Sequence, residues 1–225
     1  MKSYLRKRCI CAWFVSALVV LATAMSLGGC VSTERDNSPG FQDARDPSPT
    51  PETMHALANI LAAQGRQRDS AMILRRLMRE HPRYAPAYSK LAELYVRSDR
   101  IDRAIDILEA GLDVAPEDPT LHNNLGMCKL LQADYPTALA HFVEATRLRP
   151  DHRAYLANRA MTLGLLGRYG ESLELYKQFL EPHRAHHNLA VICLSRDDLT
   201  RARRHQALAR SLKPHPPPGA RPGQR

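Results

Sequence analysis

Residues 119–150 read PTLHNNLGMCKLLQADYPTALAHFVEATRLRP, and this stretch decides the expected fold. Apolar and small side chains recur at intervals of three and four residues in both halves, which places them on one face of an α-helix. A short polar stretch separates the halves, and Pro136 stands where the first turn of a helix tolerates a residue without an N–H group. The pattern predicts two helices of about 13 residues joined by a turn.

The helical pattern returns along the chain with a fixed period. Pro82, Pro116 and Pro150 follow one another at intervals of 34 residues, and each is expected to close one pair of helices, because proline interrupts a helix. Small residues recur at position 8 of the repeating unit, where they let the two helices approach closely. They are Ala92, Gly126, Ala160 and Ala190.

This pattern resembles the tetratricopeptide repeat, a helix–turn–helix unit with apolar and small residues at fixed positions and a closing proline. Repeats two and three match it best. The resemblance implies an all-α solenoid of about five helix–turn–helix repeats in a right-handed superhelix, whose concave face is lined by the first helix of each repeat. The expected repeats are 51–84, 85–118, 119–152, 153–182 and 183–214.

The last two repeats depart from the pattern. Repeat four is four residues short near Glu181 and Pro182, so we expect the superhelical pitch to change there. Repeat five is degenerate, and its second helix has a thin apolar stripe among many charges, as expected of a terminal repeat with a polar outer face.

The N-terminus predicts an export signal. Residues 1–8 are basic, residues 10–29 carry no charge, and the stretch ends in Leu27-Gly28-Gly29-Cys30. This ending resembles the bacterial lipobox, which implies that residues 1–29 are a lipoprotein signal peptide and that Cys30 receives a covalent lipid such as palmitate. The alternative is an uncleaved inner-membrane anchor. Val31 after the cysteine, by the same resemblance, implies the outer membrane, facing the periplasm.

Two segments lack the composition of a folded core. Residues 30–50 are rich in proline, serine and aspartate and are expected to form a disordered linker. Residues 215–225 are expected to form a disordered, proline-rich tail. Within the array, Cys128 and Cys193 lie two repeats apart, so we expect two packed thiols and no disulfide.

No arrangement of residues after Cys30 predicts catalysis. We find no HExxH, Walker A, G-x-S-x-G or CxxC motif there. His183, His186 and His187 could place imidazoles on one helix face, but no acidic or cysteine ligand accompanies them, which favours a polar surface over a metal site. We therefore expect no enzyme, no metal, no small-molecule substrate and no cofactor apart from the lipid on Cys30.

The predicted binding site is the groove formed by the first helices. Asn124, Asn158 and Asn188 share position 6, where an asparagine either binds a ligand backbone or bonds the neighbouring repeat; both interpretations stay open. The resemblance places other groove residues at positions 2, 5, 9, 12 and 13. Among them are Asn123, Met127, Leu131, Met161, Leu165, Glu93 and Arg97. The two methionines are equally compatible with partial burial.

These features predict a lipid-anchored, non-catalytic adaptor in the bacterial cell envelope that binds a protein or peptide segment. A lipobox, a linker and about five repeats resemble the small lipoproteins of pilus and secretion systems, such as the TadD type. The alternative is a scaffold for cell-wall or outer-membrane assembly enzymes. Despite the basic isoelectric point of about 9.6, export to the envelope argues against nucleic acid as a partner.

Overall fold

The computed structural model describes residues 49–214, and this part of the chain contains ten α-helices and no strand. The predicted signal peptide, Cys30, the linker up to residue 48 and the tail 215–225 lie outside the described residues. The helices are α2 (Pro51–Ala63), α3 (Gln67–Glu80), α4 (Ala85–Arg97), α5 (Ile101–Val114), α6 (Pro119–Leu131), α7 (Tyr135–Leu148), α8 (Arg153–Leu165), α9 (Tyr169–Lys177), α10 (Pro182–Ser195) and α11 (Leu199–Ser211).

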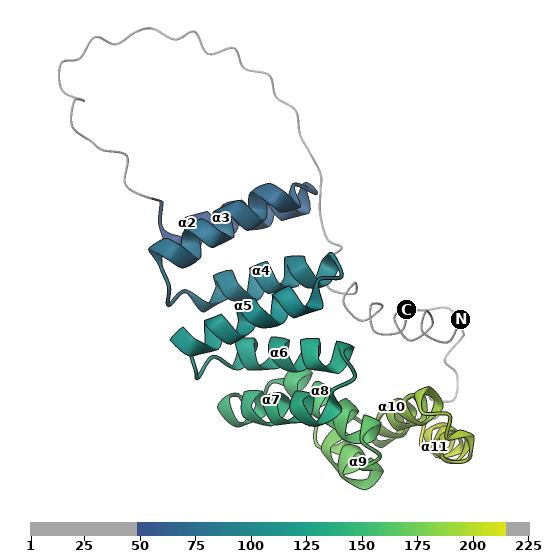
Figure 1. The fold of residues 1–225 in the computed structure, drawn as a ribbon. Helices are drawn as coiled ribbons and strands as arrows, with labels where there is room; N and C mark the ends of the chain where they lie inside the picture. The colour runs from purple at the N-terminus through teal and green to yellow at the C-terminus, as the bar shows by residue number, and fades with distance from the viewer. Residues whose placement is uncertain (1–48, 215–225) are drawn as a thin grey trace, which may run out of the picture. The chain divides into compact units, whose positions relative to one another are not determined.

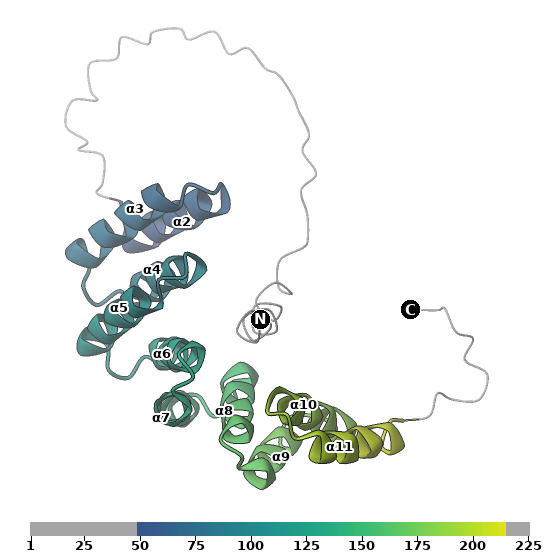
Figure 2. The ribbon, with the colours of Figure 1, turned by 45° about the vertical axis from the view of Figure 1, so that its right-hand side comes forward.

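The ten helices form five consecutive pairs that follow a curved path (Figure 1). Figure 2 shows the first helix of each pair on the inner side of the curve and the second on the outer side. The second helix of each pair also packs against the first helix of the next pair. The structure thus confirms the predicted all-helical solenoid of five helix–turn–helix repeats. None of the helices between residues 49 and 214 is both long enough and apolar enough to cross a membrane.

Short polar side chains cap several helices. The Asp118 carboxylate accepts hydrogen bonds from the backbone N–H groups of Thr120 and Leu121 at 2.8 and 2.9 Å, which satisfies two donors that the first turn of α6 leaves open. Asp134 caps α7 and Asp198 caps α11 in the same way. These caps fix the helix starts locally, before any packing between repeats.

The turn inside every repeat has the same backbone conformation. One residue at position 15 has a positive φ between 58° and 82°, the left-handed region that glycine enters without strain. The residues are Gly65, Asp99, Ala133, Gly167 and Asp197. Aspartate tolerates this region better than most residues, whereas alanine does not. The same turn geometry therefore occurs in every repeat, including repeat three, where alanine is unfavourable at this position.

Small residues allow the paired helices to touch. A Cβ atom added to Gly126 would lie 2.8 Å from the ring of Phe142, so only glycine fits there. In repeats one and four, Ser70 and Ser172 replace the small alanine of the second helix. Each buried hydroxyl donates to a backbone carbonyl of the first helix at 2.7 Å, which satisfies its hydrogen-bonding capacity.

Repeat four is shorter than the others because its second helix is shorter. Helix α9 has 9 residues, against 14 in α3, α5 and α7. Pro182, the early proline of this repeat, begins α10. Helix α10 packs about equally against α8 and α9, whereas the earlier first helices pack mainly against the second helix of the preceding pair. The packing between repeats thus changes at the position where the sequence is short.

Candidate partner-binding face

The predicted groove residues all lie on first helices, from α4 to α10, on the inner side of the curve (Figure 2). None of them is buried: Arg97 and Leu131 are exposed and the other eight are half-buried. They therefore remain accessible, and equivalent positions on consecutive first helices are expected to form one face. We call this the inner face.

Amide side chains connect repeats three and four across the inner face. Asn158 Nδ2 on α8 donates to Asn123 Oδ1 on α6 at 2.8 Å, and Asn123 Nδ2 donates to Asn124 Oδ1 at 3.3 Å. Asn158 therefore bonds the neighbouring repeat, which is one of the two interpretations of position 6. These bonds leave Asn124 Nδ2 and Asn158 Oδ1 unused, so both atoms can still meet the backbone of a bound peptide.

The apolar part of the inner face extends farther than the sequence analysis predicted. Met127 and Met161 are half-buried, and Met161 packs against the core of repeats four and five. Leu131 is 37% exposed, and on α10 Val191 is 52% exposed. Val191 occupies position 9 of its repeat, as Met127 and Met161 do, so the register alone was enough to find it.

Helix α4 contributes a polar segment to the same face. Glu93 lies between two cations of its own helix, 2.9 Å from Lys90 and 3.9 Å from Arg97. Such partly exposed pairs add little stability, because water screens them. The inner face is thus polar and charge-paired at α4, whereas from α6 to α10 it combines asparagine amides with apolar side chains.

The cysteines and histidines do not assemble a reactive site. Cys128 and Cys193 are both buried and free, and burial raises the pKa of the Cys128 thiol to about 11, which keeps it protonated and unreactive. Between residues 49 and 214, no three side chains of histidine, cysteine, aspartate or glutamate come close enough to hold a metal ion together. His186 contacts His205 on α11, a pairing that the sequence analysis missed.

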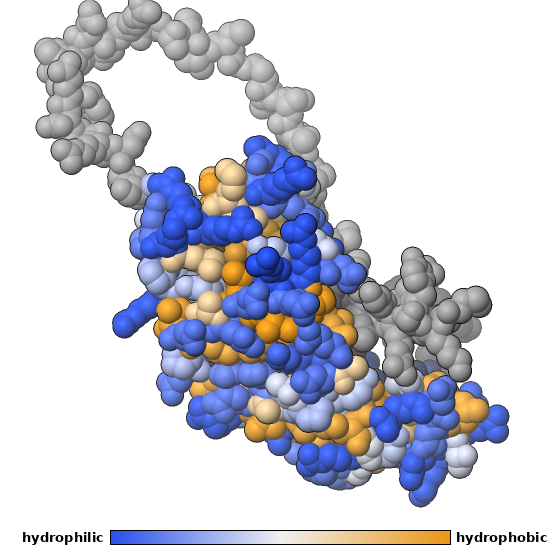
Figure 3. Space-filling view, viewed as in Figure 1, coloured by the Kyte–Doolittle hydropathy of each residue, from blue (hydrophilic) through white to orange (hydrophobic). Residues whose placement is uncertain are grey.

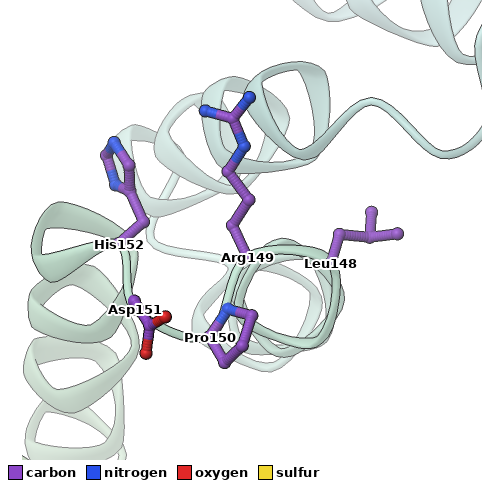
Figure 4. A pocket seen from close by; sticks show the side chains of 5 residues that line it. All are labelled: Leu148, Arg149, Pro150, Asp151 and His152. Carbon is purple, nitrogen blue, oxygen red and sulfur yellow. The ribbon is translucent and has the colours of Figure 1, made fainter.

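A hollow at the turn from α7 to α8 does not bring its charged and aromatic side chains together into one site. It is lined by Leu148, Arg149, Pro150, Asp151 and His152. Figure 4 shows that Arg149 and His152 extend to one side of this turn, apart from each other, while the Asp151 carboxylate points to the other side. Figure 3 shows hydrophilic surface broken by apolar patches, including one over the α10–α11 end. The inner face is therefore the better candidate for binding.

Comparisons with known proteins agree with the observed repeats. Three family models described as tetratricopeptide repeat match residues 52–128, 129–183 and 183–205. Among curated proteins, human protein O-mannosyl-transferase TMTC1 is 31% identical over 146 residues, which are 63% of this chain and 17% of that protein. Mouse superkiller complex protein 3 is 29% identical over 87 residues, 39% of this chain and 6% of that protein. The chain thus spans less than a fifth of these relatives.

Solved structures show the same fold at low sequence identity. YrrB, described as a tetratricopeptide-repeat protein with an unusual peptide-binding site, has a TM-score of 0.57 at 18% identity, over 73% of this chain and 87% of that one. A MamA structure gives 0.58 at 12%, over 72% and 91%. PilF from Pseudomonas aeruginosa gives 0.56 at 16%, over 74% and 78%. Together, the family matches and the helix pairs identify residues 52–205 as an array of tetratricopeptide repeats.

Proposed function

We propose that the chain is a non-catalytic, lipid-anchored adaptor of the bacterial cell envelope, which binds a protein or peptide segment on its inner face. The observation that carries this proposal is the row of amides from Asn124 to Asn158, next to accessible apolar side chains such as Leu131. Amides recognise the backbone of a ligand, while the apolar surface receives its side chains. Tetratricopeptide repeats are interaction scaffolds, and the similar YrrB structure has a peptide-binding site.

The apolar residues favour a partner with apolar side chains. Methionine is flexible and polarisable, so Met127 and Met161 can adapt to several shapes. The ion pairs around Glu93 make the α4 end suited to a polar part of the same segment. Repeats three and four are therefore the centre of the proposed site.

The lipid anchor is proposed from the sequence of the N-terminus. Leu27-Gly28-Gly29-Cys30 follows a basic and then an uncharged stretch. A lipid on Cys30 would hold the array at a membrane surface, and Val31 favours the outer membrane. In that setting, assembly of a pilus or secretion apparatus, as for TadD-type lipoproteins, is the function that we propose. A scaffold for cell-wall or outer-membrane assembly enzymes is the alternative.

Site-specific crosslinking in cells tests the binding face. A photo-reactive amino acid replaces Met127 or Met161 on the inner face, and Val143 on the outer helix α7 serves as an exposed apolar control. We expect the inner positions, but not Val143, to capture the same partner. Components of a pilus or secretion apparatus among the products would support the first assembly role, and cell-wall enzymes the alternative. Equal capture at all three positions would contradict the assigned face.

Metabolic labelling with radioactive palmitate tests the anchor separately. The substitution Cys30→Ala removes the only sulfur that the lipobox offers for acylation, so label and processing at this site should both be lost. Label that persists on the variant would overturn the lipoprotein assignment without affecting the inner face.

A further inference from the structure

Two pairs of histidines join the helices of repeats three and five. The Nδ1 atoms of His122 on α6 and His141 on α7 are 3.3 Å apart, and those of His186 on α10 and His205 on α11 are 2.9 Å apart. In both pairs the first histidine is at position 4 and the second at position 23 of the repeat. The same contact is therefore built twice.

The ring geometry identifies each contact as a hydrogen bond between imidazoles. The ring centroids are 5.6 Å apart in repeat three and 5.1 Å apart in repeat five. These separations exceed the Nδ1···Nδ1 distances by about two ring radii, so the ring nitrogens point straight at each other, as an N–H···N hydrogen bond requires. A metal ion held by both nitrogens would need lone pairs that converge at an angle. The geometry thus favours a shared proton over a metal.

A third contact locates the shared proton in repeat three. His122 Nε2 lies 2.9 Å from the carbonyl oxygen of Pro116, which can only accept. In the neutral ring Nε2 therefore carries the proton, Nδ1 is the acceptor, and His141 Nδ1–H donates to it. A first added proton can still be shared, because His141 can change to its Nε2–H tautomer and accept from His122 Nδ1. A second proton leaves two N–H groups face to face and removes the hydrogen bond.

The other three repeats place hydrocarbon or an aromatic ring at these two positions. Their pairs are Met54 with Ile73, Tyr88 with Ile107, and Leu156 with Leu175. The histidines thus occupy the interface that elsewhere holds the two helices together by apolar packing. A charge placed there is disfavoured, because burial separates it from water.

Burial and nearby charges oppose protonation of His141 in the pair of repeat three. Burial, His122 and Lys129 on α6 all lower the pKa of His141. Glu144 on α7 is the anion that acts on this pair, because its own pKa is lowered in part by His122. Its carboxylate is already held by Arg147 at 2.6 to 3.0 Å, so it compensates only weakly.

The pair of repeat five has cationic neighbours. Burial and Lys177 on α9 lower the pKa of His186. Burial, His186, Arg204 and Arg201 lower the pKa of His205. The surroundings therefore favour the neutral forms of His141, His186 and His205.

We propose that the two histidine pairs are proton-sensitive contacts, which join the helices of repeats three and five near neutral pH and separate when both rings of a pair carry a proton. Two like charges about 3 Å apart repel strongly in a half-buried interface. The unfolded chain, with ordinary histidines, takes up protons first as the pH falls. Stability is therefore fully present above about pH 6.5 and is lost as the pH drops below it.

The response also bears on the inner face. Helices α6 and α10 each carry one histidine of a pair together with inner-face residues, among them Asn123 and Val191. Their loosening would lower the affinity for a partner in acid. This consequence rests on the proposed function, whereas the proton response itself does not, and the test below needs no partner.

Thermal unfolding of the full chain in detergent tests the proposal. The midpoints are compared at about pH 7.5 and about pH 5.5, a window above the ordinary pKa of carboxyl groups. We expect the midpoint to fall by several degrees at the lower pH. A fourfold variant that copies the Leu156 and Leu175 pair should lose most of this fall. It carries His122→Leu, His141→Leu, His186→Leu and His205→Leu.

A matched control changes histidines outside the pairs. The double variant His183→Gln, His187→Gln alters the same number of histidines as one pair and should keep the full fall. A remainder is expected in every variant from His55, whose pKa is lowered by burial and by Lys90. A fourfold variant with an undiminished fall, or a control that loses it, would overturn the proposal.

Nuclear magnetic resonance of the unmodified chain keeps the proposal testable if the fourfold variant does not fold. The ring signals of the four paired histidines are followed as the pH is lowered. We expect the signals of His141, His186 and His205 to titrate below the ordinary histidine range, and each pair to take up its protons in two separate steps. Titration of all four rings as independent, ordinary histidines would overturn the proposal.

Discussion

Leu57 in repeat one and Leu125 in repeat three occupy the same position 7 of their repeats, but their surroundings differ. Leu125 is 2% exposed, whereas Leu57 is 45% exposed. Position 10 repeats the contrast, since Ile60 is 54% exposed and its counterparts in later repeats are buried. Burial at these positions is therefore supplied by the preceding repeat, and within the described residues nothing precedes α2.

The two ends of the array also differ from each other. At position 24 of the repeat, on its second helix, repeats three and four bury Phe142 and Tyr176, whereas repeat five has the half-buried Gln206. The exposed side chains of α11 include Arg203 and Arg210. The last repeat thus combines a charged second helix with exposed apolar side chains such as Leu199 and Leu212, while α2 at the start of the described residues leaves Leu57 and Ile60 uncovered.

The largest expected effect tests this contrast directly. Leu125→Ala should lower the free energy of unfolding by about 2–5 kcal/mol, because it leaves a cavity between repeats. Leu57→Ala should cost less than about 1 kcal/mol, because much of the side chain is already in water. Chemical denaturation of both variants measures the two values. Similar losses would mean that Leu57 is covered in the full chain by something outside the described residues.

A second comparison concerns two glycines. Gly126→Ala should destabilise by about 1–3 kcal/mol, because its Cβ would lie 2.8 Å from the Phe142 ring between two packed helices. Gly170→Ala in the first turn of α9 meets nothing within 4 Å and should stabilise slightly, since alanine favours the helix. Thermal midpoints of the two variants should therefore shift in opposite directions. A neutral Gly126→Ala would show that the helices of repeat three separate easily.

The sequence predicted what each repeat determines alone. The proline interval set the frame, small residues such as Gly126 marked the close contacts, and the helix pairs appear where they were expected. It did not predict what depends on a second helix or a neighbour. The pairing of His122 with His141 joins side chains on different helices, at an interval that no helical periodicity reveals. The exposure of Leu57 depends on the lack of a preceding helix pair within residues 49–214.

The inner face shows the same division. The sequence placed Asn158 at the correct register but left two interpretations of its role open. The hydrogen bond to Asn123 depends on the rotation of α8 against α6, which is a property of the packing. Val191 shares position 9 with Met127 and Met161, so the register predicts it. Repeat five departs from the repeat pattern, and no groove residue was assigned at its position 9. Binding by these residues stays a prediction.

A third prediction compares two asparagines at the same position. Asn158→Ala removes the 2.8 Å bond to Asn123 between repeats and should cost about 0.5–1.5 kcal/mol of stability. Asn188→Ala in repeat five removes no hydrogen bond recorded among residues 49–214, and its effect should be smaller. Denaturant midpoints of the single variants measure this difference. If both variants lose the same stability, the bond between repeats contributes nothing measurable.

The smallest expected effect concerns the turns, which do not follow the contrast between terminal and interior repeats. Ala133 in repeat three has a φ of 62° and Gly65 in repeat one has a φ of 79°, so both lie in the left-handed region. An L-residue in this region loses about 1–2 kcal/mol of stability. Glycine removes this strain, but its larger conformational freedom in the unfolded chain cancels part of the benefit.

Ala133→Gly should therefore stabilise by about 0.5–1 kcal/mol. Gly65→Ala should destabilise by a similar amount, because a Cβ there meets nothing within 4 Å and only the backbone strain remains. Thermal midpoints of the two single variants, measured side by side, check the pair. Equal and opposite shifts would show that the turn is set locally in every repeat. A larger stability change for Ala133→Gly than for Gly65→Ala would mean that packing against the neighbouring repeats also affects the turn of repeat three.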